Sequence, residues 1–204
     1  MKLWKIILIS LALYGCEKEG FAQEPQKELR AEVIIENPVF KVWYSEIKEQ
    51  PLKLIYTSTN RVKNVDRGSM NFYTEKEVHT SDNADYYRNV WDKGHLAPAA
   101  TYSDSYENLR QTFSYLNCAL QQEKLNRGTW KHLEEFERGL TQFGDVRVTI
   151  EVDFPEQLER VPAGAAIPSG FYKQIMVGDS MWCYWFPNKV PTSSDFRDYE
   201  CDCR

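Results

Sequence analysis

The residues Asp92-Lys93-Gly94-His95 bring an imidazole, two opposite charges and a glycine together within four positions. A neutral imidazole near pH 7 can accept a proton from water, which is the task of a general base in hydrolysis. The chain has only two other histidines, His79 and His132. Taken alone, the motif fits a glycine turn with a surface histidine better than a catalytic site. The assignment therefore depends on residues farther along the chain.

Two side chains with hard oxygen atoms follow in a segment of helical periodicity. Asn126 and Glu134 are separated by a little over two helical turns, so we expect their side chains to project in neighbouring directions. An amide oxygen and a carboxylate suit Mg²⁺ or Ca²⁺ and suit zinc poorly. Because Mg²⁺ keeps several waters, one asparagine and a glutamate acting through water are sufficient to hold it. The alternative is an ordinary amphipathic helix in which Asn126 is a surface residue.

The elements that must position these residues are mostly short strands. Runs of β-branched and aromatic residues predict strands, which we place at 39–44, 52–57, 113–116, 146–152, 167–177 and 181–186. Asp104 and Ser105 can cap a short helix over 106–112, and apolar spacing predicts the principal helix over 122–138, ended by Gly139. The predicted class is α+β, a mainly antiparallel β-sheet core with one principal helix.

The 204 residues are expected to hold one folded domain, over residues 38–204. Residues 1–16 combine a basic start with a short apolar run, which predicts an export signal. This run ends at Cys16 in a pattern that resembles a bacterial lipoprotein box. We therefore expect a lipid anchor at Cys16 and an extracytoplasmic, membrane-anchored lipoprotein. Cleavage after Ala22, giving a secreted or periplasmic protein, is the alternative. Residues 17–37 are polar and charged, and we interpret them as a tether.

The formal net charge is −5, so the molecule as a whole does not attract polyanions such as nucleic acids. A nucleic-acid site would therefore need a local basic patch. Basic residues do gather in or beside the motif segments, namely Arg88, Lys93, Arg110, Lys124, Arg127 and Lys131. Lys93 and Arg127 are our candidates for contacts with phosphate, although an ordinary solvated helix face would carry similar charges.

Four cysteines remain when Cys16 is set aside, and they are Cys118, Cys183, Cys201 and Cys203. In an oxidising compartment they allow three full pairings, among which the sequence does not choose. A metal site at the Cys201-Asp202-Cys203 motif is weakly supported, because no second pair or histidine lies at ligand spacing. We favour one disulfide that pins the C-terminal tail, with Cys183 as the expected partner.

Several motifs at matched spacing resemble the DNA/RNA non-specific endonuclease family, the ββα-metal or His-Me finger nucleases. The resemblance covers roughly residues 38–188, and it is carried by Asp92–Ala99, Thr112-Phe113, Asn117, Gln121, Leu125–Gly128, Trp130 and Leu133-Glu134. It implies a ββα-metal motif within the sheet-rich fold. It also implies a Mg-dependent, sugar-non-specific endonuclease, an enzyme that hydrolyses phosphodiester bonds of DNA and RNA.

The resemblance implies a role for each matching residue. His95 is the expected general base, Asn126 the direct ligand of Mg²⁺, and Glu134 the residue that holds a water of the ion. Mn²⁺ or Ca²⁺ could take the place of Mg²⁺. Asn117 is expected to orient the site by hydrogen bonding, and Arg67 to contact phosphate.

The family usually has arginine at the position of Lys93, which the resemblance places in the catalytic motif. Lysine keeps the charge but loses the planar, bidentate fork of arginine. Two other functions stay open. The chain could be a surface lipoprotein that kept the fold as a binding module, or a phosphodiesterase acting on small nucleotides. Retention of His95, Asn126 and Glu134 together argues against the first. No specific protein partner is evident in the sequence.

Overall fold

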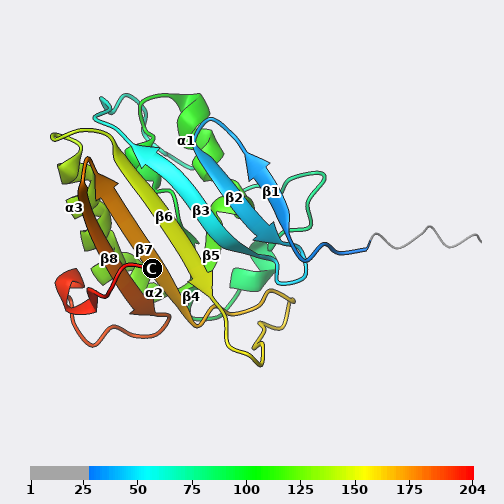
Figure 1. The fold of residues 1–204 in the computed structure, drawn as a ribbon. Coiled ribbons are helices and arrows are strands. Elements are labelled where there is room, and N and C mark those ends of the chain that lie inside the picture. Colours follow the sequence, from blue (N-terminus) through cyan, green and yellow to red (C-terminus); the bar gives the residue numbers. More distant parts are fainter. Residues whose placement is uncertain (1–27) are drawn as a thin grey trace, which may run out of the picture.

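The computed structural model describes residues 28–204, and six of its strands form one antiparallel sheet. In order across the sheet, the strands are β1 (Val33–Glu36), β2 (Phe40–Ser45), β3 (Gln50–Ser58), β6 (Val146–Asp153), β7 (Gly170–Val177) and β8 (Ser180–Pro187) (Figure 1). Every neighbouring pair runs antiparallel. The predicted α+β class with a mainly antiparallel sheet is confirmed.

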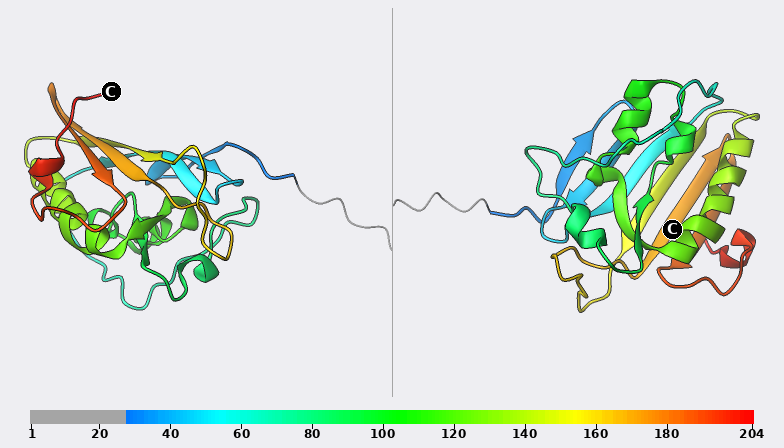
Figure 2. Two further views of the ribbon diagram at one scale, coloured as in Figure 1. Left: turned by 90° about the horizontal axis from the view of Figure 1, so that it is seen from below. Right: turned by 180° about the vertical axis from the view of Figure 1, so that it is seen from behind.

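The sheet buries one face against a second layer. Along β6, Val146, Val148, Ile150 and Val152 are buried, whereas the residues between them are partly or fully exposed. Successive side chains of a strand point to opposite faces, so this period of two directs one row of residues into the core. The helices and the two remaining strands lie against that face, as the left view of Figure 2 shows.

The second layer carries a ββα unit. Strand β4 (Trp91–His95) pairs antiparallel with β5 (Cys118–Gln122). Three helical segments follow directly, namely α2 (Glu123–Leu125), a π-helical turn η4 (Asn126–Trp130) and α3 (Lys131–Leu140). The shorter elements of this layer and of the C-terminal segment are η1 (Asn83–Tyr86), η2 (Ala99–Thr101), α1 (Tyr106–Thr112), η3 (Tyr115–Asn117) and η5 (Phe196–Tyr199). This arrangement is the ββα motif that the resemblance to the nuclease family implies.

The principal helix is less regular than its apolar spacing suggests. Gly128 has φ −114° and ψ −105°, which are not helical values, so the chain kinks between α2 and α3. Such π-helical turns interrupt the regular spacing of 3.6 residues per turn. The helix also continues through Gly139 and ends at Leu140. Side chains on the two sides of Gly128 therefore do not follow one helical phase.

Two strand boundaries differ from the predictions. Strand β1 lies inside residues 17–37, the range interpreted as a tether, and Val33 pairs with Tyr44 of β2. The sequence signal of this edge strand is weak because it is short and Ile34 is exposed. The buried strand predicted at 113–116 is wrong, since the chain turns through η3 and the strand begins only at Cys118.

The disulfide joins the C-terminal tail to β8. Cys183 and Cys203 are bonded, so the prediction that a disulfide pins the tail to Cys183 is confirmed. Cys118 is a buried free thiol and Cys201 is a partly buried one. Burial raises the pKa of Cys118 to about 12, so this thiol stays protonated near neutral pH and is a poor nucleophile.

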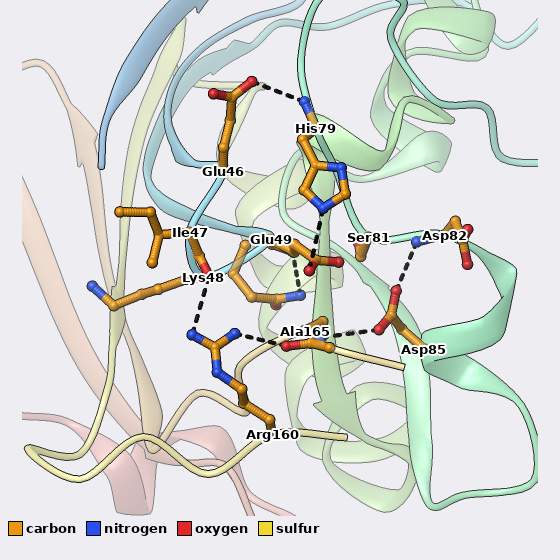
Figure 3. Close-up of polar contacts among 12 residues, drawn as sticks. Glu46, Ile47, Lys48, Glu49, His79, Ser81, Asp82, Asp85, Arg160 and Ala165 are labelled. Carbon is orange, nitrogen blue, oxygen red and sulfur yellow. Dashed lines mark hydrogen bonds and ion pairs between the residues drawn. The ribbon is translucent and has the colours of Figure 1, made fainter. Parts of the chain in front are cut away.

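A cluster of polar contacts ties the β2–β3 turn to two distant loops (Figure 3). The buried carboxylate of Glu46 accepts a hydrogen bond from the backbone N–H of His79 at 2.9 Å. It also accepts two hydrogen bonds from the Arg30 guanidinium, each at 2.8 Å. In the same turn, the carbonyl oxygen of Ile47 accepts a hydrogen bond from Arg160 at 3.1 Å. Glu46 therefore connects the segment of Arg30 with the loop of His79, which are far apart in the sequence.

Replacing Glu46 with glutamine is expected to lower the free energy of unfolding by about 1–3 kcal/mol at neutral pH, because charge-assisted hydrogen bonds are lost. Hydrogen bonding from Arg30, above all, holds the pKa of Glu46 far below its usual value. Such a carboxylate stabilises the fold above its unfolded pKa, and this contribution is lost as the pH falls. In urea unfolding, the difference between Glu46→Gln and wild type should shrink below roughly pH 4.5.

A control for this measurement is Glu36→Gln, since Glu36 pairs with Lys41 on the surface. Exposed pairs of this kind typically contribute about 0–1 kcal/mol, so this variant should unfold almost like wild type. A destabilisation of Glu46→Gln that stays constant into the acid range would contradict the assigned cause.

Candidate active site

One cavity brings together five of the residues that the sequence singles out. It has a volume of about 560 Å³, and its lining includes Arg67, Lys93, His95, Asn126 and Arg127. Strand β4 supplies Lys93 and His95, the turn η4 supplies Asn126 and Arg127, and the long loop after β3 supplies Arg67. Asn117 and Glu134 are not among the lining residues.

The close pairing of β4 with β5 explains Gly94. A Cβ atom at this position would lie 2.5 Å from Oε1 and 2.6 Å from Cβ of Gln121, closer than real atoms approach. Only glycine therefore lets the two strands meet here. The neighbour that requires glycine here is Gln121, which lies on the paired strand β5. His95, the next residue of β4, is thereby held at a fixed place beside the cavity.

The imidazole of His95 lies in an aromatic environment. Its ring centroid is 4.8 Å from that of Phe72 and 5.1 Å from that of Phe113. The Nε2 atom is buried and has no hydrogen-bond partner among the described residues. Burial, assisted by the positive charge of Arg67, lowers the pKa of His95 to about 3. The ring is therefore neutral at pH 7, which is the form a general base requires.

Asn117 holds the chain directly after His95. Its side-chain oxygen accepts a hydrogen bond from the N–H of Ala97 at 2.7 Å. Its amide nitrogen donates to the carbonyl oxygens of Ala97 and Thr112, each at 2.9 Å. The side chain is fully buried, so these three bonds satisfy it within the protein. Asn117 can therefore fix the position of His95 without touching a ligand in the cavity.

Asp92 connects the histidine strand to the asparagine turn. One of its oxygens accepts hydrogen bonds from Nδ2 of Asn126 at 2.9 Å and from Nε of Arg127 at 2.8 Å. Its other oxygen accepts from Nη2 of Arg127 at 2.6 Å. From the sequence alone, Asp92 is only a charge beside His95, and this role is not visible. Its place in the His95 motif was the available signal, but the partners are more than thirty residues away.

The amide of Asn126 fits a metal ligand. Because Nδ2 donates to Asp92, the opposite atom, Oδ1, is the oxygen left to accept, and no described residue donates to it. An amide oxygen is a hard ligand of the kind that Mg²⁺ uses together with several waters. Among the described residues, no group of three or more His, Cys, Asp or Glu side chains could hold a metal. The donors present thus suit a cation that keeps most of its own waters.

Glu134 lies on α3 and faces the indole of Trp130. Its Oε1 accepts a hydrogen bond from the Trp130 Nε1–H at 3.0 Å. Burial raises the pKa of Glu134 to about 7, and the nearby positive charge of Lys173 opposes this rise. Asn126 lines the cavity, whereas Glu134 is not among its lining residues. The two residues lie on opposite sides of the kink at Gly128.

The ammonium group of Lys93 is surrounded by aromatic rings. Its Nζ lies 5.5 to 5.7 Å from the ring centroids of Phe72, Tyr86 and Tyr115, and it donates a hydrogen bond to Oδ1 of Asn83. Aromatic faces attract cations, so this cage stabilises the charged amine. Lysine here is therefore a located point charge at the cavity wall rather than a mobile surface group.

Two named relatives resemble parts of this chain. A Bos taurus protein named endonuclease G, mitochondrial, is 38% identical over 79 residues, which are 37% of this chain and 26% of that protein. A Saccharomyces cerevisiae mitochondrial nuclease is 34% identical over 133 residues, or 56% of this chain and 40% of the yeast protein. The chain thus spans less than half of the length of either relative.

A solved structure has the same fold. It is described as an EndoG/EndoGI complex that shows the mechanism of EndoG inhibition. Its superposition on this chain gives a TM-score of 0.72 and covers 83% of this chain and 80% of that chain, at 25% identity.

The prediction of an extracytoplasmic, membrane-anchored lipoprotein is wrong. The bovine and yeast relatives are both named as mitochondrial, as are two further relatives. A short basic and apolar start does not by itself distinguish one targeting route from another, and this is why the pattern misleads. The predicted signal at 1–16 and the lipidation at Cys16 fall outside the described residues. Within residues 28–204, no helix is long and apolar enough to cross a membrane.

Family membership follows from a match over almost the whole chain. The sequence model described as DNA/RNA non-specific endonuclease matches residues 24–204, which include the sheet, the ββα unit and every residue that lines the cavity. The relatives and the solved structure agree with this match. The chain therefore belongs to the DNA/RNA non-specific endonuclease family.

Proposed function

We propose that this protein is a metal-dependent endonuclease that hydrolyses phosphodiester bonds in both DNA and RNA. The observation that carries the proposal is the neutral imidazole of His95 in one cavity with Asn126, Arg67 and Lys93. A base, a hard oxygen ligand and cations for phosphate are the groups that this hydrolysis requires. Membership of the family supports nucleic acid as the substrate class.

The residues of the chain divide the reaction among them. A ring nitrogen of His95 takes a proton from a water molecule as that water attacks phosphorus in line. Arg67 and Lys93 neutralise the non-bridging phosphate oxygens, on which charge grows in the transition state. Within the described part of the chain, neither Arg67 nor Lys93 forms an ion pair with a carboxylate, so both charges can interact with phosphate. Loss of the 3′-oxygen gives products with 5′-phosphate and 3′-hydroxyl ends.

The metal is proposed to be Mg²⁺, with Mn²⁺ or Ca²⁺ able to take its place. Asn126 would hold it through Oδ1, and Asp92 fixes the orientation of the amide by accepting a hydrogen bond from Nδ2. When bound, the ion supplies positive charge beside the phosphate and the departing 3′-oxygen. Glu134, whose Oε1 accepts from Trp130, is proposed to hold one of its waters, and Asn117 is proposed to keep His95 in position through its hydrogen bond with Ala97.

Digestion of plasmid DNA and of RNA, each with and without EDTA, tests this function. We expect cleavage of both polymers, loss of cleavage in EDTA and recovery when Mg²⁺ is added in excess, because Asn126 alone cannot replace the charge of the ion. Cleavage that EDTA leaves unchanged would contradict the role of the metal. Hydrolysis of a small phosphodiester without polymer cleavage would instead indicate a small-nucleotide phosphodiesterase. Binding of nucleic acid without any hydrolysis would indicate a binding module.

A further inference from the structure

A second cavity lies directly beside the candidate active site. Its volume is about 390 Å³, and it shares Arg67, Met70 and Asn71 with the first cavity as a common wall. Tyr106 and Arg110 of α1 line its far side. A ligand that extends out of the active site over this wall would therefore enter the second cavity. The proposed function gives no role to Tyr106 or Arg110.

The charge of the second cavity favours an anion. Arg67 and Arg110 both line it, and neither forms an ion pair with a carboxylate within the part of the chain that the structure describes. The one acidic residue of the lining, Asp66, accepts a hydrogen bond from the backbone N–H of Gly68. The two guanidinium groups thus outnumber the single carboxylate, and a guanidinium fork matches the geometry of phosphate.

The Arg110 guanidinium is held in place before any ligand arrives. Its central carbon lies 3.7 Å from the ring centroid of Tyr73, and Nη1 donates to the carbonyl oxygen of Asn71 at 3.4 Å. Stacking on Tyr73 restricts the rotamers of a side chain that is otherwise costly to immobilise. Since Asn71 belongs to the shared wall, the guanidinium is anchored at the boundary between the two cavities.

An aromatic side chain stands at the edge of the same cavity. Tyr106 is the first residue of α1, and 58% of its surface is exposed. No other aromatic ring packs on it within the described residues. Exposed rings beside basic grooves are the surfaces on which unpaired bases stack. In a duplex both faces of each base are already stacked, so this ring suits a single strand.

We propose that the second cavity binds the nucleotide next to the scissile phosphodiester of a single-stranded substrate. Arg110 contacts the phosphate of that nucleotide, Tyr106 stacks on its base, and Arg67 lies between the two phosphates at the shared wall. This inference rests on the proposed function, because it places the scissile bond in the first cavity. It adds a binding site that supplies affinity and strand preference without taking part in the chemistry.

Kinetics of Arg110→Ala on two substrates test the phosphate contact. With a long single-stranded oligonucleotide, we expect KM to rise by about fivefold or more while kcat stays near the wild-type value, because Arg110 does not touch the reacting atoms. The slope of log affinity against log salt should fall by about 0.7, the value for one phosphate contact on a single strand. With a small diester such as bis(p-nitrophenyl) phosphate, rates should not change, since this substrate ends within the first cavity.

The matched control is Arg147→Ala. Arg147 is an exposed arginine on β6 that lines neither cavity, so the variant loses the same charge elsewhere. It should leave both substrates and the salt slope unchanged. An Arg110→Ala enzyme with the KM and the salt slope of wild type on the oligonucleotide would overturn the proposal. An equal rise in KM and an equal fall in the salt slope for Arg147→Ala would also overturn it, because the effect would then come from the overall charge of the protein.

Tyr106→Ala tests the stacking. We expect affinity for the single-stranded oligonucleotide to fall by roughly tenfold and affinity for a duplex of the same sequence to change little. Equal losses on the two substrates would overturn the assignment of Tyr106. These affinities are measured by fluorescence anisotropy in EDTA, where cleavage is absent. The anisotropy comparison therefore stands even if the wild-type protein hydrolyses no substrate, a result that would defeat the proposed function alone.

Discussion

Alanine in place of His95 is expected to lower the rate of phosphodiester cleavage by about 10²–10⁴-fold, the usual contribution of a general base. The ring is neutral at working pH because burial lowers its pKa to about 3, so the whole population of wild-type enzyme carries the base in its active form. Alanine leaves the water without a proton acceptor. Single-turnover cleavage of a labelled oligonucleotide at saturating Mg²⁺ measures the step directly, because product release does not then limit the rate.

His132→Ala is the matched control for this experiment. His132 lies on α3 with an exposed side chain whose Nδ1 is 3.2 Å from the carbonyl oxygen of Ser194, and it does not line the cavity. Its removal should leave the rate nearly unchanged. Added imidazole should restore part of the activity of His95→Ala, which a merely unfolded variant would not show. A His95→Ala rate within twofold of wild type would remove His95 from the role of base.

Most of the sheet could be predicted because its signal is local. The alternation at Val146–Val152 is visible in one stretch of chain, and it reports the single buried face directly. Residues 113–116 show where such a signal fails. This apolar run is buried, but tertiary packing bends it into η3, with Asn117 bonded to Ala97 and Thr112. The apolar composition of residues 113–116 indicates that they are buried, but it does not indicate whether they form a strand.

The candidate site divides in the same way. His95 and Asn126 could be identified because each lies in a compact motif, and the structure places both at one cavity. The link that Asp92 makes to Asn126 could not be identified, because it depends on the pairing of distant segments. The kink at Gly128 could not be identified either, because sequence periodicity assumes helical dihedral angles at that position. The residues of each motif are neighbours in the sequence and can be identified there, whereas the distances between motifs depend on the folded structure.

An ion pair behind the site is expected to control stability. Lys173 of β7 and Glu137 of α3 are both fully buried, and Nζ lies 2.7 Å from Oε2. The hydroxyl of Tyr56 donates to the same oxygen at 2.7 Å. Replacing Lys173 with methionine keeps the length of the side chain but leaves the Glu137 carboxylate without its countercharge. We expect the free energy of unfolding in urea to fall by about 3–5 kcal/mol, the typical cost of breaking such a pair.

The triple variant Lys173→Met, Glu137→Leu and Tyr56→Phe separates the charge from the packing. It removes every polar atom of the group, and the second oxygen of Glu137, which is buried and accepts no hydrogen bond from a described residue, is removed with them. Taking ions out of water costs nearly as much as their attraction returns, so apolar replacement of a whole pair is often neutral. We therefore expect the triple variant to regain most of the stability that Lys173→Met loses.

If the triple variant is as unstable as Lys173→Met, the packing of these side chains rather than their charge holds α3 on the sheet at this point. If Lys173→Met alone unfolds like wild type, the buried pair does not set the stability of the layer that carries His95 and Asn126.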